Sequence, residues 1–128
     1  MNIYVICTVR QRTPEEESTV KAYVEDLRTK GHSVFYPTED APQDDTGFQI
    51  VMVELDAIRN ADRIDIFWHN NSKGSHFDLG AALALKKQIK LAGVFHKDDG
   101  KSYLKVIEKI TENQEATRKQ CTCCMCKE

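Results

Sequence analysis

No excess of positive charge marks this chain. Its 18 lysine and arginine residues are outnumbered by 20 aspartate and glutamate residues, which leaves a formal net charge of −2. Binding to a nucleic-acid polymer relies on clustered positive charge, and no basic stripe runs along any segment here. We therefore expect no DNA or RNA partner. The low positive charge does not exclude a single nucleotide as a ligand.

Long apolar runs are also missing. A helix that crosses a bilayer needs about 20 consecutive apolar residues, and no segment of the chain approaches that length. The opening segment, MNIYVICTVR, has neither a basic start nor a small-residue cleavage site, so it predicts a β-strand rather than a signal peptide. We expect a cytoplasmic protein with no membrane partner.

Cysteines are scarce over most of the chain. Cys7 falls in an apolar segment, and the others crowd near the end of the chain, at Cys121, Cys123, Cys124 and Cys126. Such thiols are normally reduced in a cytoplasmic protein and can bind a soft metal ion. Their C-x-C-C-x-C spacing is tighter than that of structural zinc sites. Residues 120–128 are therefore predicted to be a flexible tail without a metal role, and no cofactor is expected.

Residues 1–119 are predicted to form one domain in which strands and helices alternate. Thr13, Pro14 and Glu16 have the pattern of a capping box at a helix start, and Gly31 fits the helix end. Strands are expected at 2–8, 33–36, 63–68 and 89–95, with helices at 13–31, 47–60, 81–87 and 102–117. The third strand is expected to be less buried than the first, because it carries charged residues. This order predicts an α/β fold, a flavodoxin-like or Rossmann-like three-layer sandwich with a mostly parallel sheet of four to five strands.

The segment SKGSHFDLGA, residues 72–81, is the strongest functional signal. It follows the third strand, at the sheet edge where ligands of parallel sheets bind. A Gly/Ser turn that leads into a helix presents backbone N–H groups to an anion, and this turn also carries Asp78. The pattern indicates chemistry on a sugar or nucleotide. The alternative is that Asp78 is only a first-turn acid, stabilised by the helix dipole.

This segment and its upstream spacing resemble the nucleoside 2-deoxyribosyltransferase family, including deoxynucleoside 5′-monophosphate N-glycosidases. The shared pattern has an acid on a helix, Ala-Asp at the helix end, a strand, and then the turn with its second acid. Here these are Glu54, Ala61-Asp62, the strand to Trp68, and the segment 72–81. The resemblance covers residues 1–95.

The resemblance implies a mechanism. Asp78 would be the nucleophile that attacks C1′ of the sugar, and Glu54 would help to protonate or orient the leaving base. The family usually has glutamate at the first of these positions and aspartate at the second, so both acids are exchanged here. Ser72 stands where members acting on free nucleosides tend to have aspartate, which implies a phosphorylated ligand held by Ser72, Gly74 and Ser75.

The resemblance also implies a homo-oligomer whose subunits complete each other's pockets. From their positions at strand ends or at the turn, further candidate contacts to substrate are Thr8, Arg10 and His76. The expected function is cleavage or transfer at the N-glycosidic bond of a nucleoside or nucleotide. Two other functions fit the same pattern: a non-catalytic nucleotide-binding or sensing module, and an NAD-type glycohydrolase related to the TIR domains.

Overall fold

The computed structural model describes residues 1–10, 12–42, 46–96 and 102–120 of the chain. Within them, four parallel strands form one sheet in the order β2-β1-β3-β4. The strands are β1 (Asn2–Ile6), β2 (Ser33–Phe35), β3 (Arg63–His69) and β4 (Gln88–His96). The helices are α1 (Pro14–Thr29), α2 (Pro37–Asp40), α3 (Phe48–Asn60), α4 (Lys73–Ala84) and α5 (Tyr103–Gln120).

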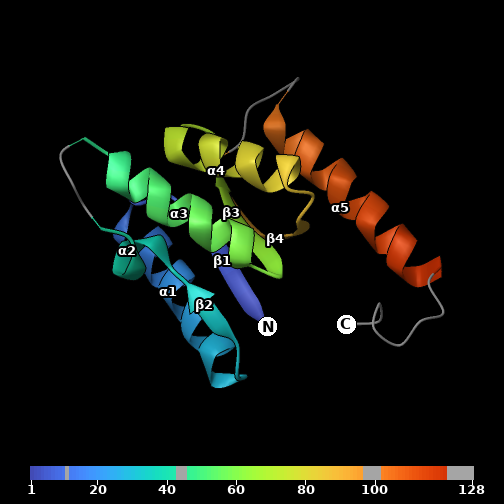
Figure 1. Cartoon of the computed structure of the whole chain (residues 1–128), viewed down its shortest axis with the longest axis horizontal. Helices are drawn as coiled ribbons and strands as arrows, with labels where there is room; N and C mark the ends of the chain where they lie inside the picture. The colour runs from blue at the N-terminus through green and yellow to red at the C-terminus, as the bar shows by residue number, and fades with distance from the viewer. Residues whose placement is uncertain (11, 43–45, 97–101, 121–128) are drawn as a thin grey trace.

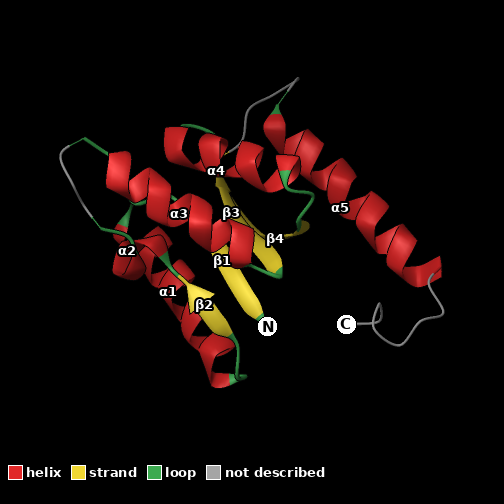
Figure 2. Ribbon diagram, viewed as in Figure 1, coloured by secondary structure: helices red, strands yellow, loops and turns green. Residues whose placement is uncertain are grey.

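Helices cover both faces of the sheet (Figures 1 and 2). On one face, α1 packs through Val24 and Leu27 in a cluster with Val5 of β1. On the other face, α3, α4 and α5 bury apolar side chains such as Ile58 and Leu79 in a second cluster. This arrangement confirms the predicted three-layer, flavodoxin-like sandwich. No helix of the described residues is long and apolar enough to cross a membrane.

Local signals placed α1 correctly. Thr13 is the N-cap, and its side chain accepts a hydrogen bond from the backbone N–H of Glu16 at 3.1 Å. Pro14 occupies the first turn, where its missing N–H costs nothing. Gly31 follows the helix with a φ of +94°, a left-handed conformation that favours glycine. These cap residues fix both ends of α1.

The start of α4 differs from the prediction. The helix begins at Lys73 rather than near residue 81, so most of the predicted Gly/Ser turn is its first two turns. Ser72 is the N-cap, and its hydroxyl accepts a hydrogen bond from the N–H of Ser75 at 3.2 Å. Glycine lowers helix propensity, so the sequence did not predict a helix start before Gly74. Capping by Ser72 and the burial of Leu79 outweigh that cost.

The expectation that the third strand is less buried was wrong. β3 lies between β1 and β4, and Asp65 within it is fully buried. Arg63 binds Asp65 through two hydrogen bonds of 2.6 and 2.9 Å, and the Tyr23 hydroxyl donates a third of 2.6 Å. A buried charge is tolerated when it is paired in this way.

The predicted tail lies almost entirely outside the described residues. Gln120 is the last residue of α5, and Cys121, Cys123, Cys124 and Cys126 follow it beyond the described part. The helix is tied to the sheet by Gln114, whose side chain accepts from the N–H of Ile89 and donates to the carbonyl of Lys87. These two bonds fix α5 beside β4 (Figure 1).

Candidate active site

A cleft of about 460 Å³ opens at the carboxyl edge of the sheet. Residues 7–10 after β1 form one wall, and His69 with residues 71–74 after β3 form another. Pro37, Ile50 and Glu54 line it from α2 and α3. The chain reverses its order between β1 and β3, which is the point where parallel sheets bind ligands. The volume suits a small molecule.

Asp78 projects from α4 into the wall of this cleft. Its side chain is buried, with the residue only 6% exposed. The Tyr4 hydroxyl donates a hydrogen bond of 2.9 Å to Oδ2. Oδ1 is also buried and has no hydrogen-bond partner among the described residues. The carboxyl group is therefore positioned through one oxygen and unpaired at the other.

Glu54 on α3 is the second acid in the cleft. Burial raises the pKa of Asp78 to about 6, although the Tyr4 hydrogen bond opposes that rise. Burial also raises the pKa of Glu54 to about 7, and the charge of Asp78 adds to the effect. Both carboxyl groups therefore titrate closer to neutral pH than free carboxyl groups do, and there the pair can hold one proton between them. Two acids that share a proton can take different chemical roles, one as the ionised group and the other as the acid.

Tyr4 is a site residue that was not among the candidates named from the sequence. It is fully buried on β1, and its ring stacks on Phe35 with the centroids 5.2 Å apart. Burial and the charge of Asp78 raise the pKa of Tyr4 far above its usual value, so the hydroxyl remains a donor. The sequence indicated only the face on which Tyr4 lies, because side chains alternate along β1 and Tyr4 is two residues from Ile6.

The predicted phosphate cradle is only partly in the cleft. Ser72 and Gly74 line it together with Lys73, whereas Ser75 is buried and is not among the lining residues. The Ser72 hydroxyl accepts from the Ser75 N–H, but its own proton can still be donated to a ligand. The first turn of α4 therefore presents a serine, a lysine and the positive end of a helix to the cleft.

Thr8 and Arg10 also line the cleft, but His76 does not. Thr8 is buried, and its Oγ1 has no hydrogen-bond partner among the described residues. The His76 ring lies 4.7 Å from the Trp68 ring and 5.2 Å from the Tyr103 ring, measured between centroids. Its Nδ1 is 2.6 Å from the carbonyl oxygen of Ser72. These contacts hold the His76 ring beside Trp68 and Tyr103, and His76 touches the cleft wall through the backbone of Ser72.

Two lining residues, His69 and Asn71, were not among the candidates named from the sequence. The signal for a site role was their position at the end of β3 and just after it. Within the described residues, no group of three or more histidine, cysteine, aspartate or glutamate side chains is arranged to hold a metal ion. The weak metal candidates of the tail lie outside that part of the chain.

The fold and the cleft define a flavodoxin-like α/β protein with a small-molecule site at the switch point of its sheet. In solved structures the same fold occurs in a CMP N-glycosidase, BcmB, of Clostridium botulinum, with 18% sequence identity and a TM-score of 0.60. That match covers 87% of this chain and 83% of the other.

Two further solved structures are 2-deoxyribosyltransferases. The enzyme from Bacillus psychrosaccharolyticus has 23% identity and a TM-score of 0.64, over 84% of this chain and 81% of its own. The enzyme from Leishmania mexicana has 22% identity and a TM-score of 0.54, over 76% of this chain and 65% of its own. No family model matches the sequence, and no curated protein matches it. At these identities the likeness is one of fold.

Proposed function

We propose that this protein is an enzyme that cleaves or transfers at the N-glycosidic bond of a nucleoside or nucleoside monophosphate. The observation that carries the proposal is the pair of acids in one cleft, Asp78 and Glu54, with pKa values of about 6 and about 7. Glycosidic chemistry needs one ionised and one protonated carboxyl group. The shared fold with an N-glycosidase and two deoxyribosyltransferases supports this choice.

In the proposed reaction, Asp78 forms a bond from Oδ1 to C1′ of the sugar. The bond from C1′ to the base breaks, its electron pair goes to the base nitrogen, and Glu54 supplies the proton. Water or a second base then attacks C1′ from the side opposite Asp78 and gives its proton to Glu54, while the bond from Oδ1 to C1′ breaks and its electron pair returns to the Asp78 carboxylate. Tyr4 holds Oδ2 throughout, so that Oδ1 is the oxygen left for bond formation.

The polar rim of the cleft supports a phosphorylated substrate. Lys73, the Ser72 hydroxyl and the amino end of α4 lie along one wall, and Arg10 lies on the wall after β1. Backbone N–H groups at a helix start and nearby cations are the usual partners of a phosphate group. We therefore favour a nucleoside monophosphate over a free nucleoside.

A panel of substrates tests the proposal. The protein is incubated with nucleosides, 2-deoxynucleosides, their 5′-monophosphates and NAD, and the released base is measured. We expect release from a monophosphate, and its loss in the variant Asp78→Ala. Release from NAD alone would instead support the NAD-type glycohydrolase. If no base is released and no covalent adduct forms, while a nucleotide still binds, the protein is a nucleotide-binding module.

We propose in addition that two copies of the chain associate through α3 and α4. Phe48 and Met52 on α3 are 67% and 51% exposed, and Phe77 on α4 is 50% exposed. The two helices pack against each other and both border the cleft, so a second copy on this surface would lie beside the substrate. Light scattering of the wild type and of Met52→Glu tests this: the variant should be monomeric, and a monomeric wild type would rule the association out.

A further inference from the structure

Arg12 lies behind the cleft rather than in it. Its guanidinium donates from Nη1 to the carbonyl oxygen of Thr8 at 3.3 Å and to Oγ1 of Thr38 at 2.7 Å. Nη2 pairs with Glu17 on α1 at 3.1 Å. The Arg12 side chain is only 15% exposed, whereas that of Glu17 is 48% exposed. The ion pair is therefore screened by solvent, and the two bonds from Nη1 are the better protected contacts. One side chain thus joins the segment after β1 and the start of α1, which lie close in sequence, to Thr38 on α2, 26 residues away.

Two of these segments form walls of the candidate active site. Thr8 lines the cleft directly, within the wall of residues 7–10. Thr38 follows Pro37, which lines the cleft from the start of α2. The two hydrogen bonds from Nη1 of Arg12 therefore connect the segment of one wall to the segment of the other.

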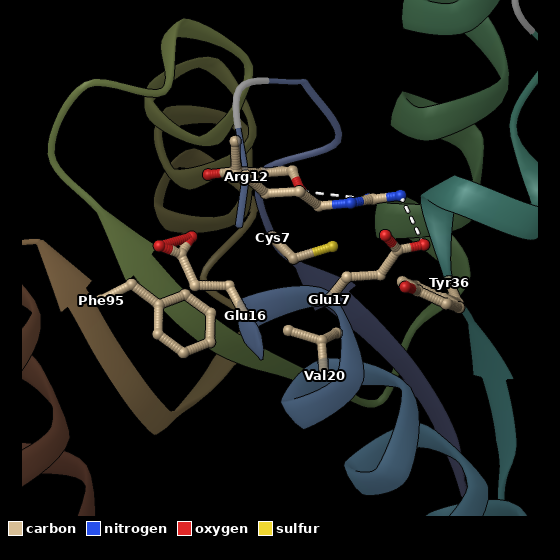
Figure 3. A pocket seen from close by; sticks show the side chains of 8 residues that line it. Cys7, Arg12, Glu16, Glu17, Val20, Tyr36 and Phe95 are labelled. Carbon is tan, nitrogen blue, oxygen red and sulfur yellow. Dashed lines mark hydrogen bonds and ion pairs between the residues drawn. The ribbon is translucent and has the colours of Figure 1, made fainter. Parts of the chain in front are cut away.

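The space under the Arg12 side chain leaves little room for the wall to move. The cavity there measures about 10 Å³, which is about the volume that one water molecule needs. Figure 3 shows the Cys7 thiol, Val20 and Tyr36 around it, with the Arg12 side chain above. Cys7 and Thr8 line both this cavity and the cleft. The residues beside the Arg12 side chain are thus also residues of the cleft wall.

We propose that Arg12 is a positioning residue that sets the wall formed by Thr8 and Arg10 against Pro37, and so sets how tightly the cleft holds its substrate. The inference rests on the proposed function. The group being positioned is the Thr8 hydroxyl, which is buried and has no hydrogen-bond partner among the described residues. Thr8 lines the cleft, and a buried hydroxyl without a partner is suited to bond a ligand group that reaches it.

The test is the kinetics of Arg12→Met and Arg12→Lys. Methionine keeps most of the apolar stem over Cys7 but removes all three polar contacts. We expect KM to rise about tenfold in Arg12→Met while kcat changes less than about threefold, because the wall contacts the substrate before and during the reaction. Lysine retains the charge and one or two of the bonds, so Arg12→Lys should restore part of the affinity. An unchanged KM in Arg12→Met would overturn the proposal.

Arg28 is the matched control. It also joins α1 to the β2–α2 region, through Glu39, Asp40 and the carbonyl oxygen of Val34. It touches neither the wall of residues 7–10 nor the cleft. Arg28→Met should lower the melting temperature without raising KM. If both arginine variants raise KM equally, the effect of Arg12 is one of general stability and the proposal fails.

Hydrogen exchange separates this inference from the proposed function. We expect the backbone amides of residues 8–10 to exchange at least about tenfold faster in Arg12→Met than in the wild type, with no such change in Arg28→Met. This readout does not require an active enzyme. A wild type that releases no base would therefore disprove the function alone. Unchanged exchange in Arg12→Met would disprove the positioning role alone.

Discussion

Two buried aspartates lie on opposite faces of the sheet, and each accepts a hydrogen bond from a tyrosine. Asp65 receives it from Tyr23 at 2.6 Å on the α1 face, and Asp78 receives it from Tyr4 at 2.9 Å on the α4 face. Burial of the two residues is similar, at 0% and 6% exposure. Burial and a tyrosine partner therefore do not distinguish them.

The two aspartates differ in their other hydrogen-bond and ion-pair partners. Arg63 contacts both oxygens of Asp65, so that side chain is neutralised and fully bonded. Asp78 has no ion pair among the described residues, and its Oδ1 has no partner. A complete set of partners stabilises the fold, whereas an incomplete set in a cleft leaves an oxygen available to a substrate. This difference supports the proposal that Asp78 takes part in the reaction, whereas the bonds of Asp65 hold the fold together.

The largest effect should come from exchanging each acid for its amide. Asp78→Asn should lower base release at least about a thousandfold, because it removes the nucleophile. Asp65→Asn should leave kcat/KM per folded molecule within about twofold, but cost about 3 kcal/mol in the free energy of unfolding, since Arg63 loses its counter-charge. Steady-state kinetics and urea unfolding of both variants measure this. Comparable losses of activity in the two variants would show that the two aspartates do not have the different roles proposed here.

Glu54 should show the next largest effect. The wild-type rate should follow a bell-shaped pH profile, rising as Asp78 ionises near pH 6 and falling as Glu54 loses its proton near pH 7. Glu54→Gln should lower the rate about a hundredfold and abolish the fall on the alkaline side. The control is Asp56→Asn on the same helix, whose carboxylate is exposed and pairs with Arg59. Its profile should match that of the wild type.

Local sequence signals explain how much of this structure could be foreseen. The ends of α1 were predictable because Thr13, Pro14 and Gly31 act within a few residues of one another. Spacing along the chain also singled out Asp78 and Glu54, which the fold brings to one cleft. The start of α4 was missed because glycine masked a helix that tertiary packing stabilises.

Pairings between distant residues could not be predicted. The bond from Tyr4 to Asp78 joins residues 74 positions apart, and the bond from Arg12 to Thr38 spans 26. No periodicity encodes either pair, since both depend on which strand lies beside which. The same limit hid the contact of Asp65 with Tyr23, 42 residues away, and so made β3 look less buried than it is.

A smaller effect concerns stability rather than rate. Burial raises the pKa of Asp78 from 3.8 to about 6, so the folded protein binds this proton more tightly than the unfolded chain does. The free energy of unfolding therefore falls as the pH rises through that range. Asp78→Asn should be more stable than the wild type by about 3 kcal/mol near about pH 8, and by well under about 1 kcal/mol near about pH 4. Urea unfolding at both pH values measures this. A gain that does not depend on pH would mean that the buried charge is not its cause.

The smallest effect comes from removing one tyrosine hydroxyl on each face. The Tyr4 hydrogen bond lowers the pKa of Asp78, so Tyr4→Phe should move the acidic limb of the rate profile to higher pH and reduce the rate near about pH 6 roughly tenfold. Tyr23→Phe leaves both Arg63 contacts with Asp65 in place. It should therefore cost about 1 kcal/mol in stability and leave the limb unmoved. The measurement is the pH dependence of the rate in the two variants. If the acidic limb of the profile shifts in Tyr23→Phe but not in Tyr4→Phe, the roles proposed for the two aspartates are reversed.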